Sequence, residues 1–228
     1  MNNQHNKNFQ DLFNSLSGSR PKFAVWYDCI QVWAYTISNS CNYRQDREDA
    51  YLSIVKKYTK DEVNKMAELL ALIVNALDSN RQQDFLGDIY MHYGFGDAKK
   101  GEYFTPYHIA YLMCQLTGDS AEATQDYITV YEPACGSGVM LIAYINKLIK
   151  DKHSPHLKAL IVASDSNPCI AMMCYIQISL LGAAGYVCVR NTLTNPMVGS
   201  ALCPPKDAFI TPLFYHPIWQ LRKINIKL

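Results

Sequence analysis

The stretch 127–150, YITVYEPACGSGVMLIAYINKLIK, changes character twice within 24 residues. Residues 127–133 form a β-branched and aromatic run that predicts a strand. The glycine-rich segment EPACGSG (132–138) follows directly, and 139–150 has helical apolar spacing with lysines near its end. A strand, a bare loop and a helix in this order present free backbone N–H groups to a ligand. A tight strand–helix turn without a ligand is the alternative.

Two further strands are predicted downstream of this unit. LKALIVASD (157–165) reads as a strand that ends in an acid, and YVCVR (186–190) reads as another. Asn167 and Pro168 are suited to the N-cap and first turn of the helix between them. Strands that alternate with helices indicate an α/β fold with a parallel sheet.

The segment between Asp165 and Arg190 contains no charged residue, so a membrane span has to be considered. It carries Gln177 and Ser179, and Gly182 and Gly185 interrupt it. We therefore expect a buried helix, a turn and a buried strand, and no membrane association.

Upstream, residues 1–95 are predicted to be helical and contain no chemistry-bearing cluster. The apolar segment 26–37 and the run 84–95 each predict a helix, and Thr59 with Glu62 forms a capping box ahead of a third. The predicted organisation is a helical N-terminal region, 1–95, followed by a cofactor-binding domain, 96–228.

Composition excludes several classes of protein. The 228 residues are 49% hydrophobic and 18% charged with a net charge of +1, which is typical of a globular protein without a global basic surface for nucleic acid. The eight cysteines form no C-x-x-C pair, and the N-terminus lacks a secretory signal. We expect a cytoplasmic protein with no metal site.

The acids on either side of the glycine loop limit the classes of ligand that it could bind. Glu132 ends the first predicted strand and Asp165 ends the second, so two carboxylates would repel a phosphate. No Gly-Lys-[ST] follows the loop, which excludes a Walker A motif. An acid at the end of the second strand suits ribose hydroxyls. S-adenosylmethionine, which has both a ribose and a sulfonium, fits these features.

The order of motifs resembles a known family. GEYFTP (101–106) ahead of EPACGSG, then ASDSNP and RNTL, resembles the adenine-N6 DNA methyltransferases, in particular the modification subunits of type I restriction systems, over about residues 84–195. The resemblance implies a Rossmann-like class I S-adenosylmethionine-dependent methyltransferase fold with a shortened sheet. It also implies that S-adenosylmethionine, or its product S-adenosylhomocysteine, contacts Tyr103, Phe104, Thr105, Pro106, Glu132, Ala134, Cys135, Gly136, Gly138, Asp165, Ser166 and Asn191.

The catalytic element of that family, Asn/Asp-Pro-Pro-Tyr/Phe, has no intact counterpart here. In the family its amide and a proline carbonyl hold the adenine amine, and its ring stacks on the extruded base. The imperfect candidates are CPPK (203–206), TPLF (211–214) and HPIW (216–219). TPLF is the best positional match, which makes Thr211, Pro212 and Phe214 the candidate catalytic residues. A proline- and aromatic-rich loop packed on the sheet is the alternative.

Three functions follow from this pattern. The first is a DNA adenine-N6 methyltransferase-like protein of a restriction–modification, phage or plasmid system, with DNA recognition supplied by partner subunits. Its expected partner is a restriction–modification protein or a second copy of this chain in a homo-oligomer. The second is a catalytically inactive methyltransferase-like binding or regulatory module. The third is a methyltransferase that acts on RNA or protein.

Overall fold

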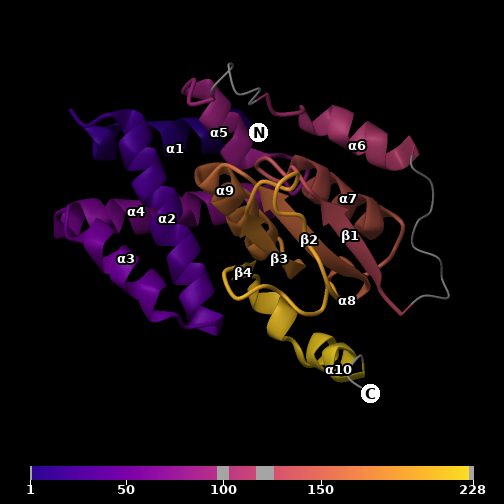
Figure 1. Cartoon of the computed structure of the whole chain (residues 1–228). Helices are drawn as coiled ribbons and strands as arrows, with labels where there is room; N and C mark the ends of the chain where they lie inside the picture. Colours follow the sequence, from indigo (N-terminus) through magenta and orange to yellow (C-terminus); the bar gives the residue numbers. More distant parts are fainter. Residues whose placement is uncertain (1, 97–102, 117–125, 226–228) are drawn as a thin grey trace.

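The computed structural model describes residues 2–96, 103–116 and 126–225 (Figure 1). Five helices precede the first gap, and they lie together on one side of the molecule. Their bounds are α1 (Asn2–Ser17), α2 (Lys22–Cys41), α3 (Gln45–Val55), α4 (Lys60–Ser79) and α5 (Phe85–His92). The predicted helical character of this region is confirmed.

Local sequence signals start two of these helices. At α4 the Thr59 hydroxyl accepts a hydrogen bond from the Glu62 N–H at 3.3 Å, and the Glu62 carboxylate accepts one from the Thr59 N–H at 2.8 Å, which confirms the predicted capping box. At α5 the Asp84 carboxylate accepts from the Gly87 N–H at 3.0 Å.

The remaining elements alternate between helix and strand up to a C-terminal helical segment. They are α6 (Tyr107–Leu116), β1 (Ile128–Glu132), α7 (Val139–Lys150), α8 (Pro155–Lys158), β2 (Ala159–Asp165), α9 (Pro168–Leu180), β3 (Ala184–Val189), β4 (Phe209–Ile210), the 3₁₀ helix η2 (Pro212–Tyr215) and α10 (Pro217–Asn225).

The sheet has the order β1-β2-β3-β4 in the described part of the chain. Strands β1 to β3 are parallel, with Glu132 opposite Ala163 and Asp165 opposite Val189. Their carboxyl ends therefore share one edge of the sheet, which is where ligands bind in open α/β folds. The predicted α/β class with a parallel sheet is confirmed. Strand β4 differs because it pairs with β3 in the antiparallel direction.

The charge-free segment folds as predicted into a buried helix, a turn and a strand. All ten residues from Cys169 to Ile178 in α9 are buried. Helix α9 lies between the sheet and α2, and most of its side chains pack in the hydrophobic core (Figure 1). Within the described ranges, no helix is both long and apolar enough to cross a bilayer.

One hydrophobic core joins the N-terminal helices to the sheet. It runs from Phe9 and Trp26 through α9 to Ile161 and Val187. Trp26 is fully buried in this core. The division between residues 95 and 96 therefore marks no break in the core.

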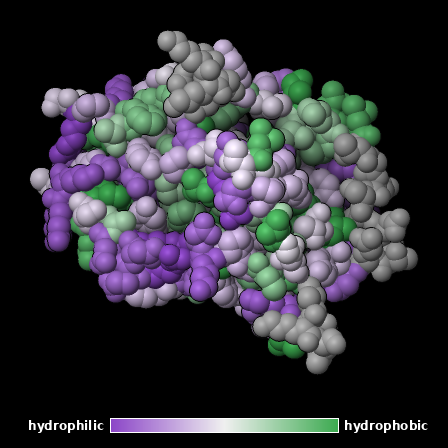
Figure 2. Space-filling view, in the orientation of Figure 1, coloured by the Kyte–Doolittle hydropathy of each residue, from purple (hydrophilic) through white to green (hydrophobic). Residues whose placement is uncertain are grey.

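The opposite face of the sheet is covered by the C-terminal segment. Tyr186 and Leu160 pack there against Phe214 and Trp219. The indole N–H of Trp219 donates to the His156 carbonyl at 3.0 Å, which fixes α10 at the amino ends of the strands. Elsewhere the surface is mixed in polarity, with an apolar area over α6 from the exposed residues Ile109, Leu112, Met113 and Leu116 (Figure 2).

Candidate cofactor site

The glycine loop runs from the carboxyl end of β1 into α7. Gly136 and Gly138 have φ values of +55° and +103°, which L side chains rarely adopt. The Cys135 N–H donates to the Ser164 carbonyl on β2 at 2.9 Å, so the loop is fixed to the neighbouring strand. Helix α7 begins after Gly138 without a side-chain cap. Bare backbone and an uncapped helix N-terminus lie side by side at this edge.

Phe104 reaches this loop from outside the strand–loop–helix unit. A Cβ atom placed on Gly136 would lie 3.7 Å from the Phe104 ring. The same ring stacks on Tyr90 of α5, with 5.5 Å between centroids. The structure therefore brings the Phe-Thr-Pro element and the glycine loop together.

The neighbours of Phe104 differ in exposure. Tyr103 is 71% exposed, whereas Thr105 is half-buried. The Pro106 carbonyl accepts from the Ile109 N–H at 3.0 Å and from the next N–H at 3.1 Å, which starts α6. Residues 101 and 102 of the motif lie outside the described residues.

The two acids lie at the same edge. Asp165 Oδ2 accepts a hydrogen bond from the Gly136 N–H at 3.0 Å, and its Oδ1 accepts from the Asn167 N–H at 2.9 Å. Glu132 Oε1 accepts from the Ala134 N–H at 3.2 Å. Each of these carboxylate oxygens keeps further acceptor capacity for a ligand. The next residue after Asp165, Ser166, is exposed.

The segment after β3 joins the site through a hydroxyl that the sequence did not single out. Thr192 donates to the Pro133 carbonyl at 2.7 Å, and its oxygen lies 2.9 Å from the Ser164 hydroxyl. Asn191, one of the expected cofactor contacts, is exposed, and its side-chain oxygen accepts from the Leu193 N–H at 3.0 Å in a local turn. In the sequence, the contact between Thr192 and Ser164 was indicated only by the position of Ser164, a serine near the end of an apolar strand.

Cys135 contributes only its backbone to the loop surface. Its thiol is buried and forms a hydrogen bond with the Cys174 thiol. This hydrogen bond and the burial together raise the pKa of the Cys135 thiol well above its usual range. A neutral, buried thiol is a poor nucleophile, so the loop holds no reactive cysteine.

Three buried polar residues behind the loop were not predicted. The Ser137 hydroxyl donates to the Asp84 carboxylate, and the Gln177 amide donates to the same carboxylate at 2.8 Å. Burial raises the Asp84 pKa, although the hydrogen bonds that it accepts oppose the shift. Two signals were present in the sequence: an aspartate directly ahead of a helix, and a lone amide within a long uncharged segment.

The candidate catalytic residues lie at the other edge of the sheet. Thr211 is fully buried, its hydroxyl accepts from the Gly185 N–H at 3.0 Å, and its own N–H donates to the Gly185 carbonyl at 2.9 Å. Because β4 is antiparallel to β3, its end meets the start of β3, whereas Asp165 lies opposite the end of β3. The structure corrects the expected placement and does not bring Thr211 to the glycine loop.

The rest of these proline-containing segments also pack as structural elements. Pro212 is exposed and begins η2, while Phe214 is 1% exposed and meets the Tyr186 ring edge-on at 6.5 Å. In the 216–219 segment Trp219 is buried, and in the 203–206 segment Cys203 is exposed. The aromatics Phe214 and Trp219 therefore pack on the sheet, as in the alternative reading of the sequence, whereas Pro212 is exposed.

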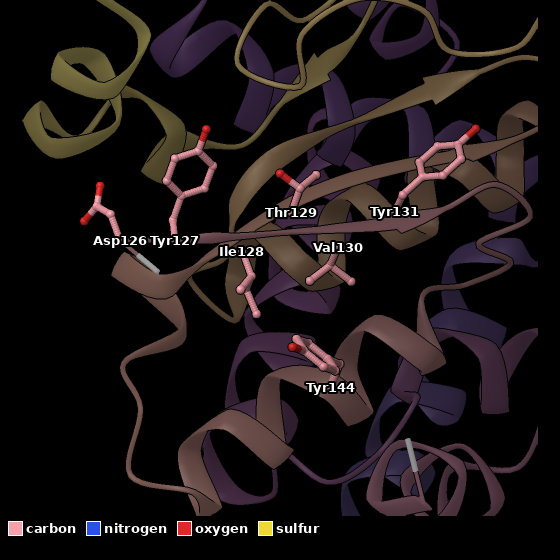
Figure 3. Close-up of a pocket in the computed structure, with 7 residues that line it drawn as sticks. All are labelled: Asp126, Tyr127, Ile128, Thr129, Val130, Tyr131 and Tyr144. Atoms are coloured by element: carbon pink, nitrogen blue, oxygen red, sulfur yellow. The ribbon is translucent and has the colours of Figure 1, made fainter. Parts of the chain in front are cut away.

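A groove of about 780 Å³ follows the outer edge of β1 (Figure 3). Ile128 and Val130 point to one side of the strand, toward Tyr144 of α7, and Thr129 and Tyr131 point to the other. No strand in the described ranges pairs with this edge. The groove leads along β1 toward the glycine loop.

Comparison with known proteins identifies the family. A family model described as N-6 DNA methylase matches residues 81–224, which is more than half of the chain. The chain belongs to this family. Membership implies S-adenosylmethionine as the cofactor. The residues at the carboxyl edge fit it, because they combine bare backbone, a helix N-terminus and two carboxylates with free acceptor capacity.

Two curated relatives are components of restriction systems. The chain is 31% identical over 115 residues to the type II restriction enzyme and methyltransferase RM.BcgI of Heyndrickxia coagulans. This match covers 44% of this chain and 17% of that protein. It is 22% identical over 212 residues to the type I restriction enzyme MjaVII methylase subunit of Methanocaldococcus jannaschii. This match covers 85% of this chain and 35% of that subunit. The chain thus spans about a third or less of each relative.

A solved structure is also similar over most of the chain. It is described as a class I S-adenosylmethionine-dependent methyltransferase from Listeria monocytogenes, at 13% identity and a TM-score of 0.44. The match covers 88% of this chain and 57% of that one.

Proposed function

We propose that this chain is the cofactor-binding part of a DNA adenine-N6 methyltransferase of a restriction–modification system. The observation that carries the proposal is the meeting of Phe104, the glycine loop and Asp165 at one sheet edge. These three come from separate segments of the chain, and a turn without a ligand would not require them to converge.

Each part of this edge has a chemical task in the proposal. Asp165 accepts hydrogen bonds from the ribose hydroxyls with the acceptor capacity that Gly136 and Asn167 leave free. The glycine loop admits the methionine end, because a side chain at Gly136 would fill the space in front of Phe104. When bound, S-adenosylmethionine supplies an electrophilic methyl group. Phe104 shields that region from water.

The acceptor side of the reaction needs groups that hold the adenine amine and stack on the base. No Asn-Pro-Pro-Tyr element lies at this edge among the residues that the structure describes. We propose that these groups lie outside the described residues and that partner subunits supply DNA recognition. The relatives support a multi-component arrangement, since one of them is a methylase subunit of a type I restriction enzyme.

Calorimetry with S-adenosylmethionine and S-adenosylhomocysteine tests the cofactor half of the proposal. We expect saturable binding of both, which Asp165→Ala abolishes or weakens strongly. Absence of binding at millimolar ligand would sink the proposal.

Transfer of a tritiated methyl group tests the reaction, with DNA, RNA and protein offered side by side in extracts that contain the partner subunits. Label in DNA adenine that depends on Asp165 supports the proposal. Label only in RNA or protein, or cofactor binding with no transfer in the complete system, favours one of the two alternative functions.

A further inference from the structure

The serine of the glycine loop faces away from the cofactor edge. Ser137 is 1% exposed, although Ala134 in the same loop is exposed and Gly136 is half-exposed. Its hydroxyl donates to the carboxylate of Asp84, which is 53 residues earlier in the chain. The loop is thus anchored from behind by a residue of the N-terminal helical region.

The Asp84 carboxylate is the centre of a closed polar network. Asp84 Oδ1 accepts from the Gly87 N–H at 3.0 Å and from the Gln177 amide at 2.8 Å, and Oδ2 accepts from Ser137. The Gln177 amide also donates to the Ser137 carbonyl at 2.9 Å, while its oxygen accepts from the Leu86 N–H at 3.1 Å. Three segments, the start of α5, the loop and α9, meet at one carboxylate.

The backbone of α5 leaves room for this carboxylate. A Cβ atom on Gly87 would lie 2.2 Å from Asp84 Oδ2, a distance that no side chain tolerates. Glycine at this position lets the carboxylate fold over the first turn of α5 and face the loop. Because the network is buried and satisfied at every polar atom named above, removing one partner leaves the others unpaired.

We infer that Asp84 is a positioning residue for the cofactor loop, and that through it the N-terminal helical region forms the rear support of the S-adenosylmethionine site. The inference rests on the proposed function only for the identity of the ligand. Asp84 touches no cofactor atom in this scheme. It acts by holding Ser137, and hence the two glycines on either side of it, in the conformation that the ligand requires.

The loop needs such support because its own backbone is unfavourable. Gly136 and Gly138, which both adopt positive φ angles, lose more conformational entropy on ordering than any other residue type would. Binding to a loop that samples other conformations loses affinity in proportion to the competent fraction. Loss of the anchor is therefore expected to weaken binding before it unfolds the protein.

Four variants separate positioning from general stability. Asp84→Ala and Ser137→Ala remove the anchor from either side. Asp84→Asn keeps an oxygen for Gly87 and Gln177 and places an amide against the Ser137 hydroxyl, so it should retain most of the network. Thr59→Ala, which removes the cap of α4, is the matched control, because it destabilises the same helical region without touching the loop.

Calorimetry with S-adenosylmethionine is expected to show at least tenfold weaker binding for Asp84→Ala and Ser137→Ala. Asp84→Asn and Thr59→Ala should stay within about threefold of wild type. The double variant Asp84→Ala/Ser137→Ala should lose no more than the worse single variant, because both remove the same bond. Unchanged affinity in both single alanine variants would overturn the inference.

Hydrogen exchange gives a readout that does not depend on the ligand. Amides of 134–139 should exchange faster in Asp84→Ala and Ser137→Ala but not in Thr59→Ala. Equal exchange in all of them contradicts the inference, even if wild type binds no S-adenosylmethionine and the proposed function fails. In wild type the cofactor should also slow exchange in α5, and Ser137→Ala should remove this effect.

Discussion

Two strand ends in this molecule carry similar local sequence and end up at opposite edges of the sheet. Strand β1 ends at Glu132, which Pro133 follows, and β4 is followed by Thr211-Pro212, in each case a polar residue ahead of a proline. Glu132 lies at the carboxyl edge beside the glycine loop, whereas Thr211 lies opposite Gly185 at the start of β3. The direction of the strand, rather than the tetrapeptide that follows it, decides whether a motif reaches the cofactor.

The separation of these edges follows from the register. Gly185 is paired with Ile161, four residues before Asp165 in β2. At a rise of about 3.3 Å per residue, Thr211 is roughly 13 Å from the level of Asp165 along the sheet. A residue at that distance, with its hydroxyl already bonded to Gly185, cannot contact a group held at the glycine loop.

The largest effect is expected from Gly185→Ala at the Thr211 edge. Its Cβ would lie 2.0 Å from the Ile161 carbonyl oxygen, so β2 and β3 could not keep their pairing. We expect a loss of more than about 4 kcal/mol in the free energy of unfolding, or no folded protein, by circular dichroism. Gly199→Ala is the control, because nothing lies within 4 Å of its Cβ and only its φ of +90° is unfavourable. A folded Gly185→Ala variant as stable as this control would contradict the register.

Asp165→Ala should have the largest effect on cofactor binding. It removes the acceptor for the ribose and for the Gly136 N–H, which sets the loop. We expect S-adenosylmethionine to bind at least tenfold more weakly, a loss of about 1.4 kcal/mol or more. Asp78→Ala, an exposed acid in α4, should leave the dissociation constant unchanged in the same titration. Equal affinities of the two variants for S-adenosylmethionine would contradict a cofactor site at this edge of the sheet.

Thr211→Val tests the Thr211 edge of the sheet. The change keeps the shape of the side chain but leaves the buried Gly185 N–H without the hydroxyl oxygen as an acceptor. We expect a loss of about 1–3 kcal/mol in the free energy of unfolding, measured in urea, and an unchanged affinity for S-adenosylmethionine. Cofactor affinity that falls while stability stays constant would restore Thr211 to the site.

The smallest effect concerns pH and the carboxylate behind the loop. Burial raises the pKa of Asp84 above its ordinary value near 3.8, so the folded protein retains a proton that the unfolded chain has released. The contribution of this group to stability is therefore complete below about pH 4 and declines as the pH rises through the folded-state pKa. Urea titrations across this range should show a flatter profile for Asp84→Asn than for wild type. Parallel profiles would show that the group does not titrate in this way.

Much of the fold could be predicted, because the signals involved are local. The apolar periodicity of α7, the β-branched composition of β1 and the capping box of α4 depend only on neighbouring residues. Strand β3 begins at Ala184, two residues earlier than predicted, because Gly185 looks like a turn residue in the sequence. In the structure it is needed where the strand backbones approach closely.

The sequence by itself determined the three parallel strands with the helices between them, the glycine loop with its two acids, and the family to which they point, since each is encoded within a short segment. The tertiary structure alone decided that β4 runs antiparallel, which removes Thr211 from the cofactor edge. It also decided that Ser137 faces Asp84 and Gln177, 53 and 40 residues away in the chain. Strand direction and long-range polar contacts are set by packing over the whole core, and no local pattern specifies them.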